Sequence, residues 1–104
     1  MSRSRLTIRA RAARDLVHHA DWLRGEAGVQ TADRFLAGAA SRFEKLARFP
    51  GLGAKVKAQA PELAHAHKWR VDGFPNWLIF YVPRPLGGIA ILRVLHGAQN
   101  WMAR

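Results

Sequence analysis

Arg93 is the residue whose type and position most demand a chemical explanation. It lies in the apolar segment IAILRVLH (Ile89–His96) and shares a predicted strand face with Ile89, Ile91 and Leu95. A charge on an apolar face must be paired or exposed. We weigh a partner surface against an ion pair, and favour the partner surface because only 7 Asp and Glu accompany 17 Lys and Arg. The acids considered for the ion pair are Asp15, Asp21 and Asp72.

The histidines give little support for a metal site. His18 and His19 are neighbours on a predicted helix, where their side chains diverge by about 100°, so we expect both on the solvated surface. His65 and His67 lie in or near a predicted loop. With no cysteine in the chain and only Glu62 nearby as a carboxylate, neither a metal nor any other cofactor is expected.

The chain is strongly basic, with a formal net charge of +10 over 104 residues. Such a surface attracts polyanions, so nucleic acid, a ribosome or an acidic protein all fit as partners. The absence of cysteine excludes disulfide scaffolds and thiol nucleophiles. No apolar run approaches the ~20 residues of a membrane span, and the basic Met1–Arg14 lacks the apolar segment of a signal peptide. We therefore expect one cytoplasmic domain, residues 1–104, without membrane contact.

The periodicity of apolar residues predicts an α+β fold in the order β-α-α-β-β-β. Gly28 is expected to end the first helix and to start a helical hairpin. The predicted strands are Ser4–Ala10, Lys68–Asp72, Trp77–Val82 and Ile89–His96, the helices are Ala12–Ala27 and Gln30–Arg48, and Pro50–His67 is a loop. The expected apolar stripe of the first helix is Ala13, Leu16, Val17, Ala20 and Leu23, and that of the second is Ala32, Phe35, Leu36, Ala39, Phe43, Leu46 and Ala47.

The two strands WLIFYV (Trp77–Val82) and IAILRVLH (Ile89–His96) are apolar on both faces. Two helices cover only one face of a mostly antiparallel sheet, so the second face needs another explanation. Either it is an exposed patch that marks a partner site, or the Pro50–His67 loop or the tail folds over it. The pattern leaves both alternatives open.

The end of the chain offers a second group of candidates. His96 closes the last predicted strand next to Gly97, where it would serve as a general base, as a target contact or as a hydrogen-bonding group at the sheet edge. Trp101 has no predicted element to pack into. The tail, residues 97–104, is therefore either a core plug or an exposed hook for a partner.

Several segments together resemble the ParE branch of the RelE/ParE toxin superfamily. The stretch ARAARDLVHHADWL resembles the first helix of these toxins, TADRFL the start of their second helix, and LARFPGLG its end. GFPNWLIFY followed by GGIAILRVLHGAQN resembles their sheet, and RVLHG after a strand ending in Phe-Tyr is the most specific match. These matches cover nearly the whole chain in order. The chain departs from the pattern at Ala98-Gln99-Asn100, where charged residues commonly follow the glycine.

The resemblance implies a mostly antiparallel sheet with a helical hairpin on one face. It also implies a toxin of a type II toxin–antitoxin pair that inhibits DNA gyrase without being an enzyme. The partner would be an acidic ParD-like antitoxin in a hetero-oligomer. We assign target binding to Arg70, Arg93, His96, Trp101 and Arg104, and antitoxin binding to Trp77, Ile79, Ile89, Ile91 and Leu95.

The alternative within the same fold is a ribosome-dependent mRNA endonuclease of the RelE branch. That chemistry needs a base or hydrogen-bonding group near the 2′-hydroxyl and cations for the transition state. Its candidate residues here are Lys68, Arg70, Arg93 and His96. The branch typically has an arginine just before the apolar strand, where Pro75 or Leu78 stands, and the tail has no tyrosine. Tyr81 lies inside an apolar strand and is expected in the core.

Overall fold

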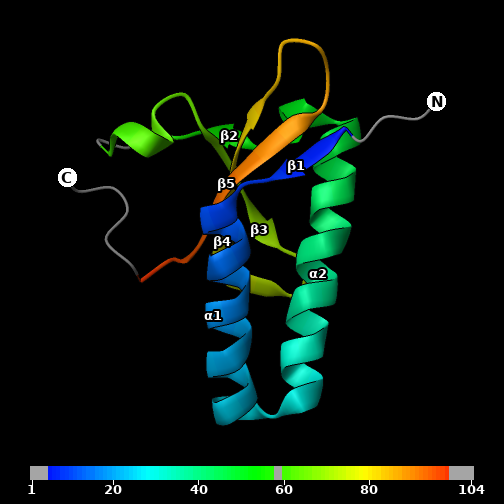
Figure 1. The fold of residues 1–104 in the computed structure, drawn as a ribbon, viewed down its shortest axis with the longest axis vertical. Coiled ribbons are helices and arrows are strands. Elements are labelled where there is room, and N and C mark those ends of the chain that lie inside the picture. Colours follow the sequence, from blue (N-terminus) through cyan, green and yellow to red (C-terminus); the bar gives the residue numbers. More distant parts are fainter. Residues whose placement is uncertain (1–4, 58–59, 99–104) are drawn as a thin grey trace.

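A computed structural model describes residues 5–57 and 60–98 of the chain (Figure 1). The described part contains two long helices, two short 3₁₀ turns and five strands. In chain order these are β1 (Leu6–Ile8), α1 (Ala10–Ala27), α2 (Val29–Arg48), η1 (Pro50–Leu52), β2 (Ala54–Lys55), η2 (Pro61–Leu63), β3 (His67–Val71), β4 (Phe74–Pro83) and β5 (Ile89–His96). None of the helices in these residues has the length and apolar character needed to cross a bilayer.

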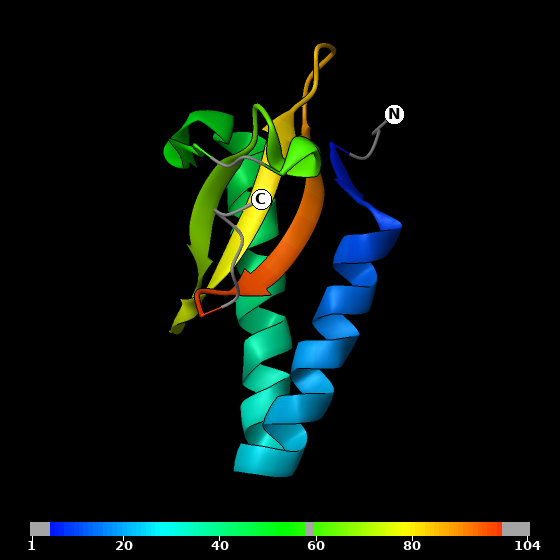
Figure 2. The ribbon, with the colours of Figure 1, turned by 90° about the vertical axis from the view of Figure 1, so that its left-hand side faces the viewer.

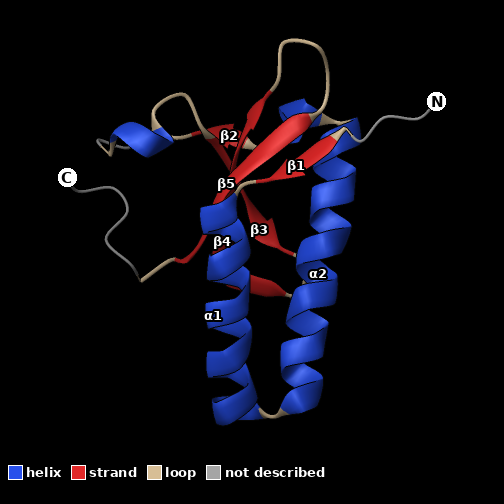
Figure 3. Cartoon of the chain, viewed as in Figure 1, coloured by secondary structure: helices blue, strands red, loops and turns tan. Residues whose placement is uncertain are grey.

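Helices α1 and α2 form the predicted hairpin around Gly28. Gly28 has a φ of 96°, a conformation that glycine adopts readily, and its N–H donates to the carbonyl of Arg24 at 3.1 Å. This contact confirms Gly28 as the residue that ends α1. The two helices run side by side, and the end of the hairpin that carries Gly28 extends past the strands (Figures 1 and 3).

The five strands form one sheet in the order β1-β5-β4-β3-β2. The pairs β4–β5, β3–β4 and β2–β3 are antiparallel, while β1 pairs with β5 in parallel. The α+β architecture and the mostly antiparallel sheet agree with the prediction. β1 stops at Ile8, so the outer edge of β5 beyond Ile91 lies beside α1 instead of another strand.

The prediction of an unstructured loop at Pro50–His67 was wrong in part. The described residues of this segment form η1, the two-residue strand β2 and η2. Each of these elements is too short to show a periodic pattern. Figure 2 shows η2 in front of β4 and β5, with α2 behind them.

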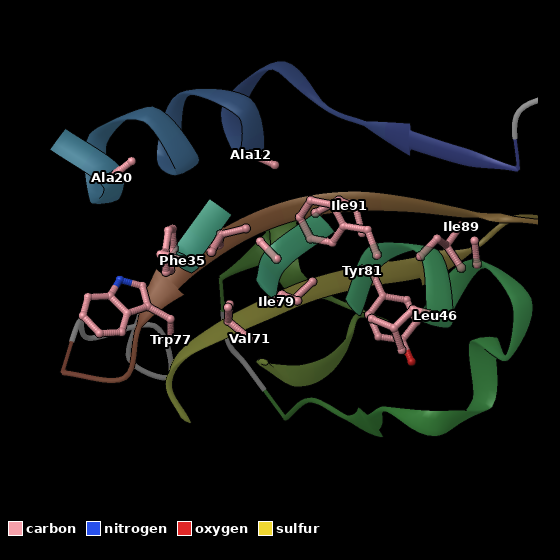
Figure 4. Close-up of a cluster of buried hydrophobic side chains, with 14 of the residues drawn as sticks. Ala12, Ala20, Phe35, Leu46, Val71, Trp77, Ile79, Tyr81, Ile89 and Ile91 are labelled. Atoms are coloured by element: carbon pink, nitrogen blue, oxygen red, sulfur yellow. The ribbon is translucent and has the colours of Figure 1, made fainter. Parts of the chain in front are cut away.

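The main core lies between the sheet and the helical hairpin (Figure 4). Phe35 and Leu46 from α2 meet Ile79, Tyr81 and Ile91 from the strands, all of them fully buried. Six members of the predicted α2 stripe are buried, and Leu36, at the solvent side, is 36% exposed. The packing of α2 therefore follows the sequence pattern closely.

The predicted stripe of α1 needs a correction. Leu16 is half-buried, and Ala20 and Leu23 are buried as expected, but Ala13 is exposed and Val17 is 61% exposed. Ala12 and His19 take the buried positions instead. The expectation that His19 lies on the solvated surface was therefore wrong: a polar residue occupies an inward position that the apolar pattern could not identify.

Candidate functional site

Arg93 forms a two-pronged ion pair with Asp15 of α1. Its Nε donates to Asp15 Oδ2 at 2.7 Å and its Nη2 donates to Asp15 Oδ1 at 3.0 Å. The backbone N–H of Val94 donates to the same Oδ2 at 2.9 Å. Asp15 thus occupies the edge of β5 where β1 has ended, and its carboxylate accepts the hydrogen bond of one backbone N–H, that of Val94, which a neighbouring strand would otherwise accept.

A second carboxylate extends this cluster to η2. Glu62 accepts hydrogen bonds from Arg93 Nη1 at 3.0 Å and from Arg11 Nη1 at 2.6 Å. The side chains of Arg93 and Asp15 are each only 14% exposed. The hydrogen bonds to Asp15 raise the pKa of Arg93 above its ordinary value, so the guanidinium stays charged. Arg93 is therefore engaged in the ion pair with Asp15 that we weighed against a partner surface, and its contact with a target stays a prediction.

The predicted position of Arg93 on the strand also needs correction. Tyr81 pairs with Ile91 and Phe80 pairs with Arg93, so Leu92 is an extra residue in β5. This bulge changes the alternation of faces. Ile89 and Ile91 therefore face the helices, whereas Arg93 and Leu95 lie on the second face with Phe80.

The second face of the sheet is largely covered, which answers the question that the two-sided pattern left open. Leu63 of η2 and the adjacent Ala66 are 1% and 0% exposed, and they pack with Phe80 and Leu95. The segment Pro61–Ala66 thus covers this face, as the loop alternative required.

The residues predicted to bind the antitoxin do not form an exposed patch. Ile79, Ile89 and Ile91 have no exposed surface, and Trp77 is 8% exposed, because all four pack under α1 and α2. Leu95 is 6% exposed on the covered second face. The order of apolar and polar residues along the strands could not reveal that Pro61–Ala66 covers this face, because that segment has no periodic pattern of its own.

Lys68 and Arg70 of β3 share the second face, because they pair with Phe80 and Leu78 of β4. Lys68 is half-buried and Arg70 is exposed. Between them, Trp69 points to the helical side, where the guanidinium of Arg42 lies 4.2 Å from its ring centroid. Arg70 is therefore a cation available at the surface of the sheet.

His96 lies on the helical side, at the end of β5. Its ring meets that of Trp77 edge to face, with centroids 4.5 Å apart. Its Nδ1 accepts a hydrogen bond from the backbone N–H of Ala98 at 2.9 Å. His96 is thus a hydrogen-bonding group at the sheet end, and Lys68 and Arg70 lie on the opposite face.

His19 is buried beside the same tryptophan. Its Nε2 lies 2.8 Å from the carbonyl oxygen of Val94, so that nitrogen carries the proton and donates. Burial lowers the pKa of His19 below 6.5, and the hydrogen bond to Val94 only partly opposes this shift. His19 therefore links α1 to β5 as a neutral imidazole.

The four candidates for RNA cleavage are not brought together. Lys68, Arg70 and Arg93 lie on the second face, where carboxylates hold Arg93 at the edge of β5, whereas His96 lies on the helical side. Tyr81 is in the core as expected, and its hydroxyl donates to Pro50 O at 2.7 Å and accepts from Gly53 N at 2.8 Å. No group of three potential metal ligands occurs among residues 5–57 and 60–98. The candidates Trp101 and Arg104 lie outside the described residues.

The helical hairpin on a mostly antiparallel sheet is the architecture that the sequence segments implied. Residues 6–101 match the family model described as "ParE toxin of type II toxin-antitoxin system, parDE". The chain therefore belongs to the ParE toxin family of type II toxin–antitoxin systems.

A solved structure supports the fold. The chain is similar to a protein described as "Chromosomal ParDE TA system from P. aeruginosa", with a TM-score of 0.69 and 18% identity. The similarity covers 88% of this chain and 92% of that chain. Comparison with curated proteins gave no significant match.

Proposed function

We propose that this ParE toxin stops growth by binding DNA gyrase in the cytoplasm, and that a cognate acidic antitoxin neutralises it. Membership of the ParE family supports a toxin with an antitoxin partner. The net charge of +10 supports an acidic partner, because complementary charges favour encounter and correct pairing.

The observation that carries the non-enzymatic reading is that His96, the candidate base, lies on the opposite face of the sheet from the three candidate cations, Lys68, Arg70 and Arg93. Cleavage at a 2′-hydroxyl needs a base and cations within hydrogen-bond reach of one phosphate group. Here Arg93 is already bound to Asp15 and Glu62, and His96 lies on the other side of the sheet from Lys68 and Arg70. The arrangement suits binding better than catalysis.

Among the candidate target contacts in the described residues, Arg70 has the most accessible position. Its side chain is exposed on β3, where a guanidinium offers a planar set of donors to carboxylates or phosphates. His96 is half-buried at the opposite face. We assign Arg70 to the target surface and retain Trp101 and Arg104 as candidates in the tail.

The deciding experiment compares two targets soon after induction of the toxin. We expect inhibition of gyrase supercoiling by the purified toxin, and primer extension on translated messages without new cleavage in the ribosomal A site. Arg70→Glu should lose growth inhibition while its thermal unfolding matches the parent. Arg34→Glu, on the exposed side of α2, is the matched charge-reversal control. Cleavage in the A site together with normal gyrase activity would replace this proposal by the RelE-type alternative.

A further inference from the structure

A pocket lined by aromatic rings lies between α1 and the strand ends near Trp77 and His96. Its volume is about 340 Å³, at the lower end of the range for small ligand sites. Five rings, from residues that are far apart in the sequence, line it: His18, His19, Trp22, Trp77 and His96. We call this the aromatic pocket.

The aromatic pocket combines a buried tryptophan with an exposed one. Trp77 is 8% exposed and meets His19 and His96 edge to face, with centroids at 6.1 and 4.5 Å. Trp22, whose ring centroid is 6.3 Å from that of Trp77, is 53% exposed. Tryptophan is enriched among the residues that contribute most of the binding energy at protein interfaces, and these residues tend to lie in pockets.

The indole N–H of Trp77 is a buried donor in one of the lining rings. Its Nε1 is buried and has no hydrogen-bond partner among the described residues. A buried donor without a partner is destabilising, because nothing compensates for its loss of hydration. Because this atom is buried, an acceptor on an occupant would reach it only after the lining rings move.

The charges around the aromatic pocket indicate the character of the occupant. None of its lining residues is acidic, and the carboxylate of the nearby Asp15 is held by Arg93. Arg14, His18 and Trp22 are all exposed and follow one another at four-residue spacing, so they form one line along α1 that ends with Glu26 beyond Trp22. This line offers a cation, an imidazole and an indole to a partner, which suits an acidic segment.

We propose that the aromatic pocket receives one aromatic side chain from an acidic segment of the antitoxin. This inference rests on the proposed function, because it names the contact through which the neutralising partner is anchored. The side chain packs against Trp22 and Trp77, and acidic residues beside it approach Arg14. The aromatic pocket thus replaces the apolar sheet patch that the sequence suggested.

The test measures the affinity of purified toxin variants for the antitoxin encoded by the neighbouring reading frame, by calorimetry. Trp22→Ala should weaken binding about 30-fold, as a hot-spot residue does, with thermal unfolding unchanged. Trp22→Phe should restore most of the affinity. Val17→Ala is the control, because Val17 is a large apolar residue on the same helix, 61% exposed, and does not line the pocket. In NMR spectra the indole N–H resonance of Trp77 should move on binding.

Each alternative result overturns the inference in a recognisable way. Equal affinity of Trp22→Ala and the parent would remove the aromatic pocket from the interface and leave the toxin–antitoxin pair intact. If Trp22→Ala changes self-association of the free toxin instead, the pocket belongs to an interface between two copies. If Trp101→Ala moves the Trp77 resonance in free toxin and antitoxin does not, the chain's own end occupies the pocket. Failure of the parent toxin to bind any antitoxin would refute the proposed function as well.

Discussion

Asp15 and Arg93 lie 78 residues apart in the chain and share two hydrogen bonds, of 2.7 and 3.0 Å. Asp15 belongs to the first helix and Arg93 to the last strand. Their ion pair closes the edge of β5 where β1 ends, and Glu62 attaches η2 to the same guanidinium at 3.0 Å. One side chain thus joins three segments that are distant in the sequence.

Truncation of Arg93 should therefore destabilise the fold. In Arg93→Ala the carboxylate of Asp15, 14% exposed, keeps one hydrogen-bond donor among the described residues, the backbone N–H of Val94. Loss of one partner from a largely buried pair lowers the free energy of unfolding by about 3–5 kcal/mol. Chemical denaturation measures this change.

The control for Arg93→Ala is Arg24→Ala. Arg24 pairs with Asp21 on the surface of α1, with side-chain exposures of 43% and 65%. Such exposed pairs contribute about 0–1 kcal/mol, so this variant should resemble the parent. If Arg93→Ala were as stable as Arg24→Ala and no longer toxic, Arg93 would return to the target surface.

The sequence pattern predicted the helical hairpin from its apolar period, β3 from its alternation, and β4 and β5 as continuous apolar runs between turn residues. It failed at Arg93 because the extra residue Leu92 shifts the alternation of β5 by one position. A bulge depends on pairing with β4, and no local pattern shows it. The same applies to β2 and η2, which are too short to have a period.

The sequence predicted which candidate residues lie together only where these residues belong to one strand. Lys68 and Arg70 share a face, as alternate residues of β3 must. The aromatic pocket, in contrast, joins His18 and Trp22 of α1 to Trp77 and His96 of two strands. Sequence analysis considered His96 and Trp77 in separate roles and assigned His18 and His19 to the solvated surface, since the approach of α1 to the strand ends is a tertiary property.

The stability of the protein should fall in mildly acidic solution because of His19. Burial lowers the pKa of His19 in the folded state below its ordinary value of 6.5. The unfolded chain therefore binds a proton more readily, and the free energy of unfolding decreases as the pH falls below about 6.5. Denaturation curves between pH 8 and pH 5 test this dependence.

His19→Gln separates this histidine from the other titrating groups. The glutamine amide retains an N–H donor for the carbonyl of Val94 but does not titrate in this range. We expect the part of the pH dependence between pH 7 and pH 5 to become flatter in this variant. An unchanged slope would assign the loss of stability to other groups.

Two glycine-to-alanine changes in the helices should have opposite effects. A Cβ at Gly38 of α2 would overlap the carbonyl oxygen of Asp72, where the helix meets the turn between β3 and β4. The backbone must move there, so Gly38→Ala should destabilise by about 1–3 kcal/mol. Gly25 of α1 has nothing within 4 Å of such a Cβ, and Gly25→Ala should stabilise by up to about 1 kcal/mol.

Thermal unfolding of both variants, compared with the parent, measures the difference. Because the two changes add the same methyl group to a helix, helix propensity alone predicts stabilisation in both. A stabilised Gly38→Ala variant would show that α2 does not approach Asp72 as closely as described.

Tyr81 provides the last test, because a tyrosine hydroxyl can act as a general acid or base, which is the chemistry that the RNA-cleaving alternative requires. Here the hydroxyl donates to Pro50 O at 2.7 Å and accepts from Gly53 N at 2.8 Å. Burial raises the pKa of Tyr81, so the phenol stays protonated at neutral pH. Both hydrogen bonds serve to hold the segment after α2 against β4.

Tyr81→Phe should therefore lower stability and preserve function. The change leaves the N–H of Gly53 and the carbonyl of Pro50 without their partner, which destabilises by about 1–3 kcal/mol. At a temperature where the variant is fully folded, growth inhibition should equal that of the parent, because the ring still fills its place in the core. Growth after induction and thermal unfolding are measured on the same variant. A folded Tyr81→Phe protein without toxicity would instead indicate that the hydroxyl takes part in the toxic reaction, and would favour the RNA-cleaving alternative.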